Sequence, residues 1–209
     1  MEGLTLTITI ILITSLVSLT TLFQYPDKIY DLSLRPTMIR DRKQYYRFFT
    51  SGLVHADLLH LGFNMFSLYF CGRFIEEIFE NIFQSKFYFL LFYVLGIIFS
   101  NIPTYLRHKN DDYYSAVGAS GAISAVIFAM VLFAPWAKIY FIIIPMPLIL
   151  YAVVYVAMTV YLDRRMQGVA GGVNHSAHLW GALFGLIFPI IFKPAIFLFF
   201  LNQLIHPTF

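Results

Sequence analysis

Polar residues that could support nucleophilic catalysis are concentrated in three short segments, each of which opens an apolar stretch. The first segment carries His60 and Asn64, the second Ser120 and the third His178. A serine hydroxyl attacks a carbonyl when a histidine accepts its proton, so Ser120 and His178 are a candidate nucleophile and base. An oxyanion formed in this reaction needs hydrogen-bond donors, and His60, Asn64 and the backbone N–H of Ser120 are candidates for them.

Each of these residues also has a structural interpretation. A single serine in a membrane helix is usually a packing residue, and His60 and Asn64 could instead hydrogen-bond the preceding loop to their helix. Catalysis is favoured because polar groups inside apolar segments are costly and mark functional sites. A triad would add a carboxylate, but no Asp or Glu lies near His178 in the sequence, and Asp57 is better placed to cap the helix that follows it. We therefore expect a Ser–His dyad.

The remaining histidines and the net charge of the chain argue against a metal site and against nucleic-acid binding. His55 and His175 are less constrained, and His175 either lines the entrance of the site or is a solvated loop residue. The helical metalloprotease signature, two histidines with a glutamate between them, does not occur, so we expect neither a metal site nor a cofactor. The net charge of +3 is too small and dispersed to indicate nucleic-acid binding.

Composition places the chain in a lipid bilayer. It is 59% hydrophobic and 12% charged, whereas soluble domains are about 25% charged. We expect a multi-pass integral membrane protein formed by one all-α domain over 1–209, with no separate soluble domain. A span needs roughly 20 mostly apolar residues. The predicted spans cover about 4–24, 57–72, 87–106, 116–134, 139–162 and 174–201.

Two further segments predict local structure. In 73–86, apolar pairs recur every three or four residues, which predicts an amphipathic helix on the membrane surface. Pro145 and Pro147 are expected to kink the fifth helix near its start.

Six spans would bring the candidate residues together. An even number of spans puts both termini on one membrane face, so the second, fourth and sixth helices enter from the other face. His60, Ser120 and His178 lie three or four residues into these helices, about 5–7 Å below the entry point at 1.5 Å per residue. Asn64 lies one turn below His60 on the same side of its helix. The four side chains therefore converge at similar depth.

Small residues accompany these groups at helical spacing. Gly118 and Gly121 flank the candidate nucleophile and leave space around it. Gly181 and Gly185 follow the candidate base and, with the alanine that precedes it, repeat every four residues. Such stripes let membrane helices approach closely, which predicts contact between the fourth and sixth helices.

The three segments resemble the motifs of the rhomboid family of intramembrane serine proteases. That family shows His-x4-His-x3-Asn in its second helix, Gly-x-Ser-Gly at its fourth and Ala-His-x2-Gly-x3-Gly in its sixth. This chain matches all three in order, and the resemblance covers the whole chain as a six-transmembrane-helix rhomboid-like bundle.

The resemblance implies roles for individual residues. Ser120 would be the nucleophile and His178 the base, with His60 and Asn64 in the oxyanion hole. The first loop of the family carries an aromatic–Arg motif, to which Tyr46 and Arg47 are similar, so a supporting role is implied for Arg47. The implied substrate is a transmembrane segment of another protein, cut at a small residue. The sequence specifies neither that substrate nor the oligomeric state.

One departure from the family pattern concerns the imidazole. Family members often carry an aromatic residue one turn after the nucleophile, stacked on the catalytic histidine, and here Ser124 holds that position. Either another aromatic, Trp180 or one from the fifth helix, replaces it, or the histidine is held less rigidly. This departure keeps an alternative open, a catalytically silent relative that binds transmembrane helices. A solute transporter is disfavoured because intramembrane charge and repeat symmetry are missing.

A second departure concerns orientation. The loops on the active-site face carry ten Lys and Arg residues and the opposite face carries four. The positive-inside rule would therefore place the site in the cytoplasm, whereas the resemblance implies the opposite. We expect the site to open on the non-cytoplasmic face, which would be that of the inner membrane if the protein is bacterial. The first loop is long and expected to be embedded in the membrane, so its Lys and Arg residues count less under the positive-inside rule.

Overall fold

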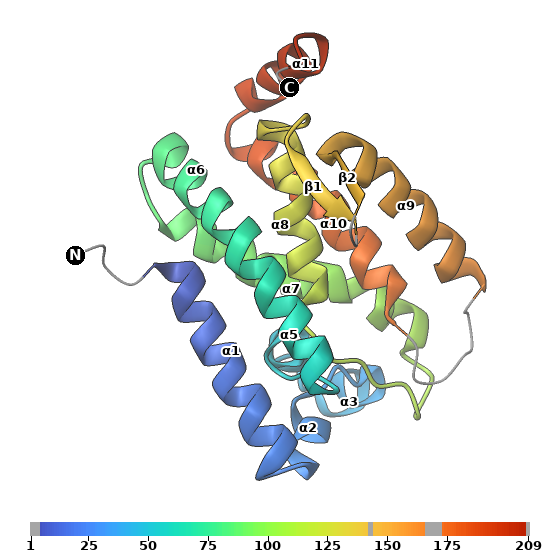
Figure 1. Ribbon diagram of the computed structural model, residues 1–209. Coiled ribbons are helices and arrows are strands. Elements are labelled where there is room, and N and C mark those ends of the chain that lie inside the picture. Colours follow the sequence, from blue (N-terminus) through green and yellow to red (C-terminus); the bar gives the residue numbers. More distant parts are fainter. Residues whose placement is uncertain (1–4, 142–143, 166–172, 208–209) are drawn as a thin grey trace.

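The computed structural model describes residues 5–141, 144–165 and 173–207, and it is mostly helical (Figure 1). Residues 4 and 142–143, which two predicted spans include, lie outside this part of the chain. The elements in chain order are α1 (Leu6–Phe23), α2 (Asp27–Leu32), α3 (Pro36–Arg42), α4 (Arg47–Thr50), η1 (Ser51–Leu53), α5 (Leu58–Ser67), η2 (Leu68–Gly72), α6 (Arg73–Phe83), α7 (Phe87–His108), α8 (Ser120–Phe133), β1 (Lys138–Phe141), β2 (Ile144–Pro147), α9 (Leu148–Arg165), α10 (His175–Phe192) and α11 (Ala195–Ile205).

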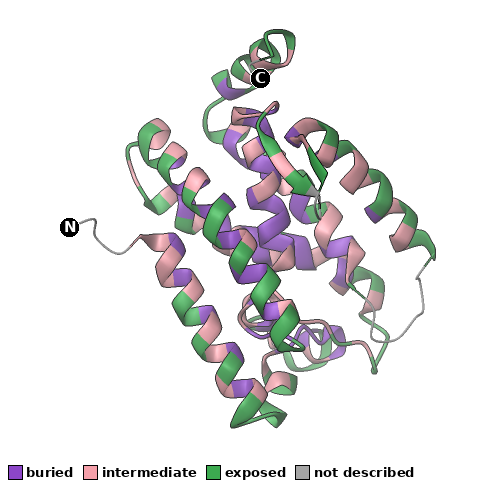
Figure 2. Ribbon diagram, viewed as in Figure 1, coloured by how far each residue is buried: buried purple, intermediate pink, exposed green. Residues whose placement is uncertain are grey.

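Helix α8 lies at the centre of the bundle and carries much of the buried surface (Figures 1 and 2). Helix α10 packs directly against it through its glycines. A Cβ atom at Gly181 would collide with the carbonyl oxygen of Gly121, and one at Gly185 would collide with that of Ala125. The predicted close approach of these two helices is therefore confirmed, and it fixes their relative register.

Three described helices are long and apolar enough to cross a membrane, namely α1, α7 and α10. Helices α8 and α11 are apolar but shorter. The count of six spans stays a prediction.

The segment after α5 differs from expectation. The chain stays helical from Leu58 to Phe83, through a π-helical turn at Leu68–Gly72, so α6 continues α5 instead of forming a separate surface helix. The apolar face of α6 is covered by the bundle: Ile75 and Phe79 are fully buried, and Phe79 contacts aromatic rings of α7 and α10. Its amphipathic period therefore reflects core packing, not contact with the membrane surface.

The helix expected over 139–162 begins only at Leu148, and the preceding residues form a two-stranded antiparallel hairpin. Pro145 and Pro147 both lie in β2, so the predicted proline kink is wrong. Each proline lacks an N–H and disfavours helical geometry in the residue before it. Two prolines separated by one residue therefore keep this segment extended.

The helices expected over 116–134 and 174–201 are also divided differently. Helix α8 begins at Ser120, because Gly118 has φ of +117°, outside the helical region. Helix α10 ends at Phe192, and α11 begins two residues later. Lys193 has torsion angles outside the helical region because it precedes Pro194, which disfavours helical geometry there.

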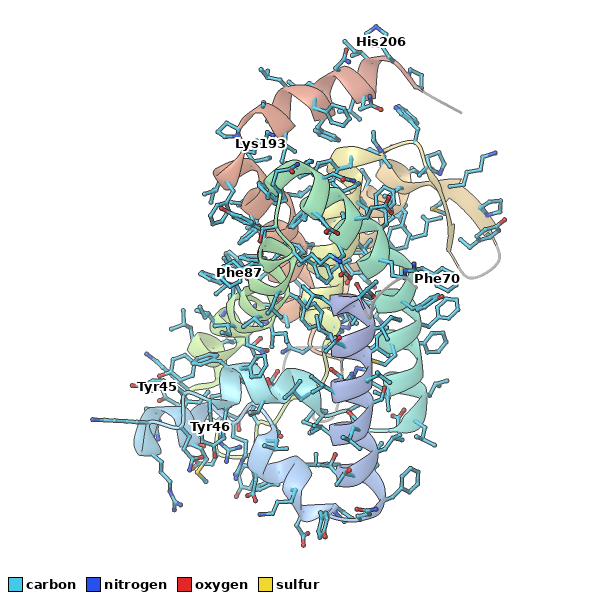
Figure 3. The ribbon with its side chains drawn as sticks, turned by 90° about the vertical axis from the view of Figure 1, so that its left-hand side faces the viewer. Tyr45, Tyr46, Phe70, Phe87, Lys193 and His206 are labelled. Atoms are coloured by element: carbon cyan, nitrogen blue, oxygen red, sulfur yellow. The ribbon has the colours of Figure 1, made fainter. Side chains whose placement is uncertain are left out.

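Two of the three loops expected to share one face, the first and the third, contact each other. In the first loop, Arg40 donates hydrogen bonds of 2.7 Å and 2.8 Å to Lys109 and Asn110 of the third. Leu34 and Ala116 form an isolated β-bridge between the same loops. Figure 3 shows Tyr45 and Tyr46 of the first loop at the opposite end of the molecule from Lys193 and His206.

Candidate active site

The structure brings Ser120 and His178 into hydrogen-bond contact. Nε2 of His178 lies 2.7 Å from Oγ of Ser120, although 58 positions separate the two residues. Ser120 is the first residue of α8, not the fourth residue of a helix as the sequence suggested, and His178 is the fourth residue of α10. Both are half-buried. The distance suits transfer of the serine proton to the imidazole.

The start of α10 is held by Asn174, which fixes the helix that carries His178. Its Oδ1 accepts the backbone N–H of Ala177 at 3.1 Å, as an N-cap does. The same oxygen accepts a 3.0 Å hydrogen bond from Oγ1 of Thr104 on α7. One amide therefore caps α10 and joins it to α7, a role that sequence reasoning missed.

Gly118 shapes the backbone just before Ser120. A Cβ atom there would lie 2.6 Å from Cε1 and 2.7 Å from Nε2 of His60, and its positive φ is unfavourable for other residues. Its N–H donates to the carbonyl oxygen of Ser51 at 2.8 Å. At the next glycine, Gly121, a Cβ atom would collide with Ser100. Both glycines thus allow close contacts on either side of Ser120.

Of the candidate oxyanion donors, His60 lies beside this backbone, and Asn64 lies one turn further along α5. The His60 ring packs against Gly118. The backbone N–H of His60 donates to Oδ1 of Asp57 at 2.7 Å, which confirms Asp57 as the predicted N-cap of α5. Asn64 is buried, and its Nδ2 donates to the carbonyl oxygen of His60 at 2.8 Å. A carboxamide has two N–H donors, so one remains for a ligand. The N–H of Ser120 opens α8, where backbone donors lack intrahelical partners.

His55, which the sequence left unassigned, is fully buried in a hydrogen-bonded chain that ends at this site. Its Nε2 accepts the N–H of Ala119 at 3.4 Å, and its Nδ1 lies 2.9 Å from Oγ of Ser18 on α1. Because an amide N–H only donates, the ring proton is on Nδ1 and points at Ser18. Burial lowers the pKa of His55 to about 3, so the ring is neutral.

Arg47 supports the first loop from within. Its guanidinium is buried and donates from Nη1 to the carbonyl oxygens of Tyr30 and Ser33, both at 2.9 Å. Its Nε donates to Oε1 of Gln44 at 2.7 Å. Burial lowers the pKa of this guanidinium. These bonds hold the start of the loop, at Tyr30 and Ser33, against its later part around Arg47.

Comparison with known proteins gives the family. The model of the Rhomboid domain matches residues 42–195, which is more than half of the chain. The chain belongs to the rhomboid family.

Individual relatives agree with this assignment. The chain is 30% identical over 153 residues to Rhomboid-like protein 11, chloroplastic, of Arabidopsis thaliana, covering 68% of this chain and 51% of that protein. It is 27% identical over 198 residues to Rhomboid-like protein 15 of the same plant, covering 85% and 47%. The chain spans about half the length of these curated relatives. With its apolar helices, membership of this family indicates an integral membrane protein.

A small cavity in this rhomboid adjoins Ser120. Its volume of about 10 Å³ is close to the space needed for one water molecule. Polar side chains from the first loop, α7, α8 and the cap of α10 line it. They belong to Ser51, Ser100, Asn101, Ser120 and Asn174. The cavity can therefore hold a water molecule beside the Ser120 hydroxyl inside the bundle.

The aromatic ring beside the imidazole of this rhomboid comes from α9. The Tyr155 and His178 rings are stacked, with centroids 6.3 Å apart. Trp180, the other candidate, is exposed and lines a separate apolar pocket between α8, α9 and α10. In the described ranges, no group of three or more His, Cys, Asp or Glu residues is arranged to hold a metal ion.

Proposed function

We propose that this rhomboid is an intramembrane serine endopeptidase that cleaves transmembrane segments of other membrane proteins by a Ser–His dyad. The observation that carries the proposal is the 2.7 Å contact between Oγ of Ser120 and Nε2 of His178. Residues far apart in sequence meet there in the pairing that activates a serine hydroxyl. The supporting observation is membership of a family that generally consists of such proteases.

The first half of the reaction forms an acyl-enzyme. Ser120 Oγ attacks the carbonyl carbon of the scissile peptide while Nε2 of His178 accepts the hydroxyl proton. The negative charge that develops on the carbonyl oxygen is stabilised by the His60 ring, the free N–H of the Asn64 amide and the backbone N–H of Ser120. When the C–N bond breaks, the imidazolium donates its proton to the leaving amine.

The second half releases the new carboxyl terminus. Water from the polar cavity beside Ser120 attacks the ester carbonyl, and His178 accepts a proton from it. The tetrahedral intermediate collapses, the proton returns to Oγ of Ser120, and the carboxylate leaves. The chain supplies every group that these steps require, so the proposal needs no cofactor.

The membrane setting is part of the proposal. We infer six spans, formed by α1, the continuous helix of α5 and α6, and then α7, α8, α9 and α10. The site would open on the non-cytoplasmic face, and the substrate would enter from the bilayer. A cysteine placed at Tyr113, in the third loop and almost fully exposed, tests the orientation. It should react with a membrane-impermeant maleimide added outside intact cells, whereas reaction only after lysis would reverse the orientation.

Activity is tested by labelling the purified, detergent-solubilised protein with a fluorophosphonate. The parent should be labelled at Ser120, and Ser120→Ala and His178→Ala should each abolish labelling while keeping the helical circular dichroism of the parent. If a well-folded parent is not labelled, the catalytically silent alternative, a protein that binds transmembrane helices, replaces the protease. Labelling that survives in His178→Ala would remove His178 from the mechanism.

A further inference from the structure

Tyr155 of α9 contacts both helices that carry the members of the dyad. Its hydroxyl lies 2.6 Å from Oγ of Ser124, a buried residue one turn after Ser120 on α8. Its ring packs at a centroid distance of 5.5 Å on Phe128, the next residue of that face of α8. On the other side it stacks on His178 of α10 with 22° between the ring planes. One side chain from α9 thus contacts the helices of the nucleophile and of the base.

We propose that Tyr155 is a positioning residue that holds the His178 imidazole toward Ser120, and that the Ser124 hydroxyl anchors it for this purpose. The proposal rests on the proposed function, since it assigns a role in the same reaction. It concerns two residues that lie outside the dyad and the oxyanion donors.

The need for such a residue follows from the dyad itself. In a Ser–His–Asp triad, a carboxylate bonded to Nδ1 sets the orientation of the imidazole. In the described part of this chain, no carboxylate hydrogen-bonds to His178, whose side chain contacts Ser120 through Nε2. Rotation about the two side-chain torsions must therefore be restricted by packing on the ring faces. The Tyr155 ring, nearly parallel to the imidazole, provides one such face.

The sequence departure at Ser124 fits this arrangement. A small side chain at that position leaves space beside His178, and its hydroxyl supplies a partner for the phenol that fills the space. An aromatic residue at position 124 would occupy the same region from α8. Here the ring comes from α9, so the geometry of the dyad depends on α9 being packed against α8 and α10.

The first test compares fluorophosphonate labelling rates of five variants with that of the parent. Tyr155→Leu removes the ring and should slow labelling about tenfold or more, within the coupling range of contacting residues. Tyr155→Phe and Ser124→Ala each remove only the hydrogen bond and should cause smaller, similar losses. Their double variant should be no slower than either single one, because both remove the same bond. Tyr161→Leu, an exposed tyrosine on the same helix, is the matched control and should label at the parental rate.

Rescue separates positioning from general packing. Adding Ser124→Tyr to Tyr155→Leu returns an aromatic ring to the region from the neighbouring helix and should restore labelling at least several-fold. If Tyr155→Leu labels at the parental rate, or if its loss is not restored by Ser124→Tyr in a folded protein, the proposal is overturned.

A second readout does not depend on activity. The imidazole resonances of His178, assigned by comparison with His178→Gln, should shift in Tyr155→Leu and stay unchanged in Tyr161→Leu. This shift is expected even if the parent is not labelled, in which case the protease proposal fails and the contact stands. Unchanged His178 resonances in Tyr155→Leu would overturn the positioning role whatever the labelling shows.

Discussion

Oγ of Ser18 lies 2.9 Å from Nδ1 of His55 and thereby links the first helix to the backbone that precedes Ser120. The hydrogen bonds form a continuous donor-to-acceptor chain from Ala119 through His55 and Ser18 to Leu53. The Ala119 N–H donates to Nε2 of His55, Nδ1–H donates to Ser18, and the Ser18 hydroxyl donates to the carbonyl oxygen of Leu53 at 2.8 Å. Each donor has an acceptor, so only the neutral ring with its proton on Nδ1 fits.

Ser18→Ala should therefore destabilise the protein beyond the loss of one hydroxyl. It leaves the buried Nδ1–H of His55 without an acceptor, which costs about 1–3 kcal/mol of unfolding free energy. Denaturant unfolding in detergent micelles measures this change. Ser15→Ala, on the same helix but not fully buried, is the control and should change stability by less than about 0.5 kcal/mol. Equal effects of the two substitutions would show that the bond to His55 contributes little.

His55 should also make stability depend on pH. Its pKa is lowered by burial to about 3, against an ordinary value near 6.5, so the folded state binds this proton more weakly than the unfolded state. The contribution is full above about pH 6.5 and is lost as the pH falls toward 3, by about 1.4 kcal/mol per pH unit for one proton. Unfolding free energies between pH 4.5 and 7.5 should show this slope.

The slope should be smaller in His55→Gln, whatever the absolute stability of that variant. His206→Gln removes an exposed histidine and serves as the control, which should keep the parental slope. A His55→Gln variant with the parental slope would show that other groups cause the pH dependence.

Much of the site could be predicted because its residues follow local rules. Ser120 and His178 stood out as polar groups in apolar segments, and the four-residue spacing of Gly181 and Gly185 indicated which helices approach. The Asp57 cap also follows from sequence, since it acts on an N–H three residues away. These features depend on helical periodicity, which a sequence displays directly.

The rest depends on contacts between distant residues, which periodicity does not reveal. Tyr155 is one of several aromatic residues on an apolar helix, and only the packing of that helix selects it. His55 and Asn174 likewise acquire their roles from Ser18 and Thr104, residues 37 and 70 positions away. The hairpin before Leu148 was missed because apolar composition predicted a span, whereas the local backbone preference of two prolines prevailed.

Asn64→Ala should slow peptide hydrolysis by about 10- to 1,000-fold if the amide is an oxyanion donor. The loss should appear in kcat, with KM little changed, because the charge it stabilises exists only in the transition state. Steady-state cleavage of a transmembrane substrate in liposomes measures both constants. Asn81→Ala, on the exposed side of α6, should leave both unchanged. A rise in KM alone would assign Asn64 to substrate binding instead.

Glu76 should stabilise the start of α1, since its two carboxylate oxygens accept the N–H groups of Leu6 and Thr7 at 2.7 Å and 2.8 Å. Glu76→Gln keeps the shape but removes the charge and one acceptor, so a loss of about 1–3 kcal/mol of unfolding free energy is expected. Glu77→Gln, the exposed neighbour, is the matched control and should be near neutral. Indistinguishable stabilities of the two variants would mean that this bridge between α1 and α6 is energetically minor.

A substitution at Gly181 of α10 should have a large effect, because the close approach of α8 leaves no space for a side chain there. A Cβ atom there would meet the backbone of Gly121, the residue after Ser120, so Gly181→Ala must push α8 and α10 apart. Overpacking of this kind costs about 1–3 kcal/mol, and the separation should also lengthen the Ser120–His178 contact. We therefore expect both lower stability and slower fluorophosphonate labelling. Gly62→Ala, with no atom within 4 Å of the added Cβ, should be neutral or stabilising and label normally. Parental labelling in Gly181→Ala would mean that the dyad tolerates displacement of its two helices.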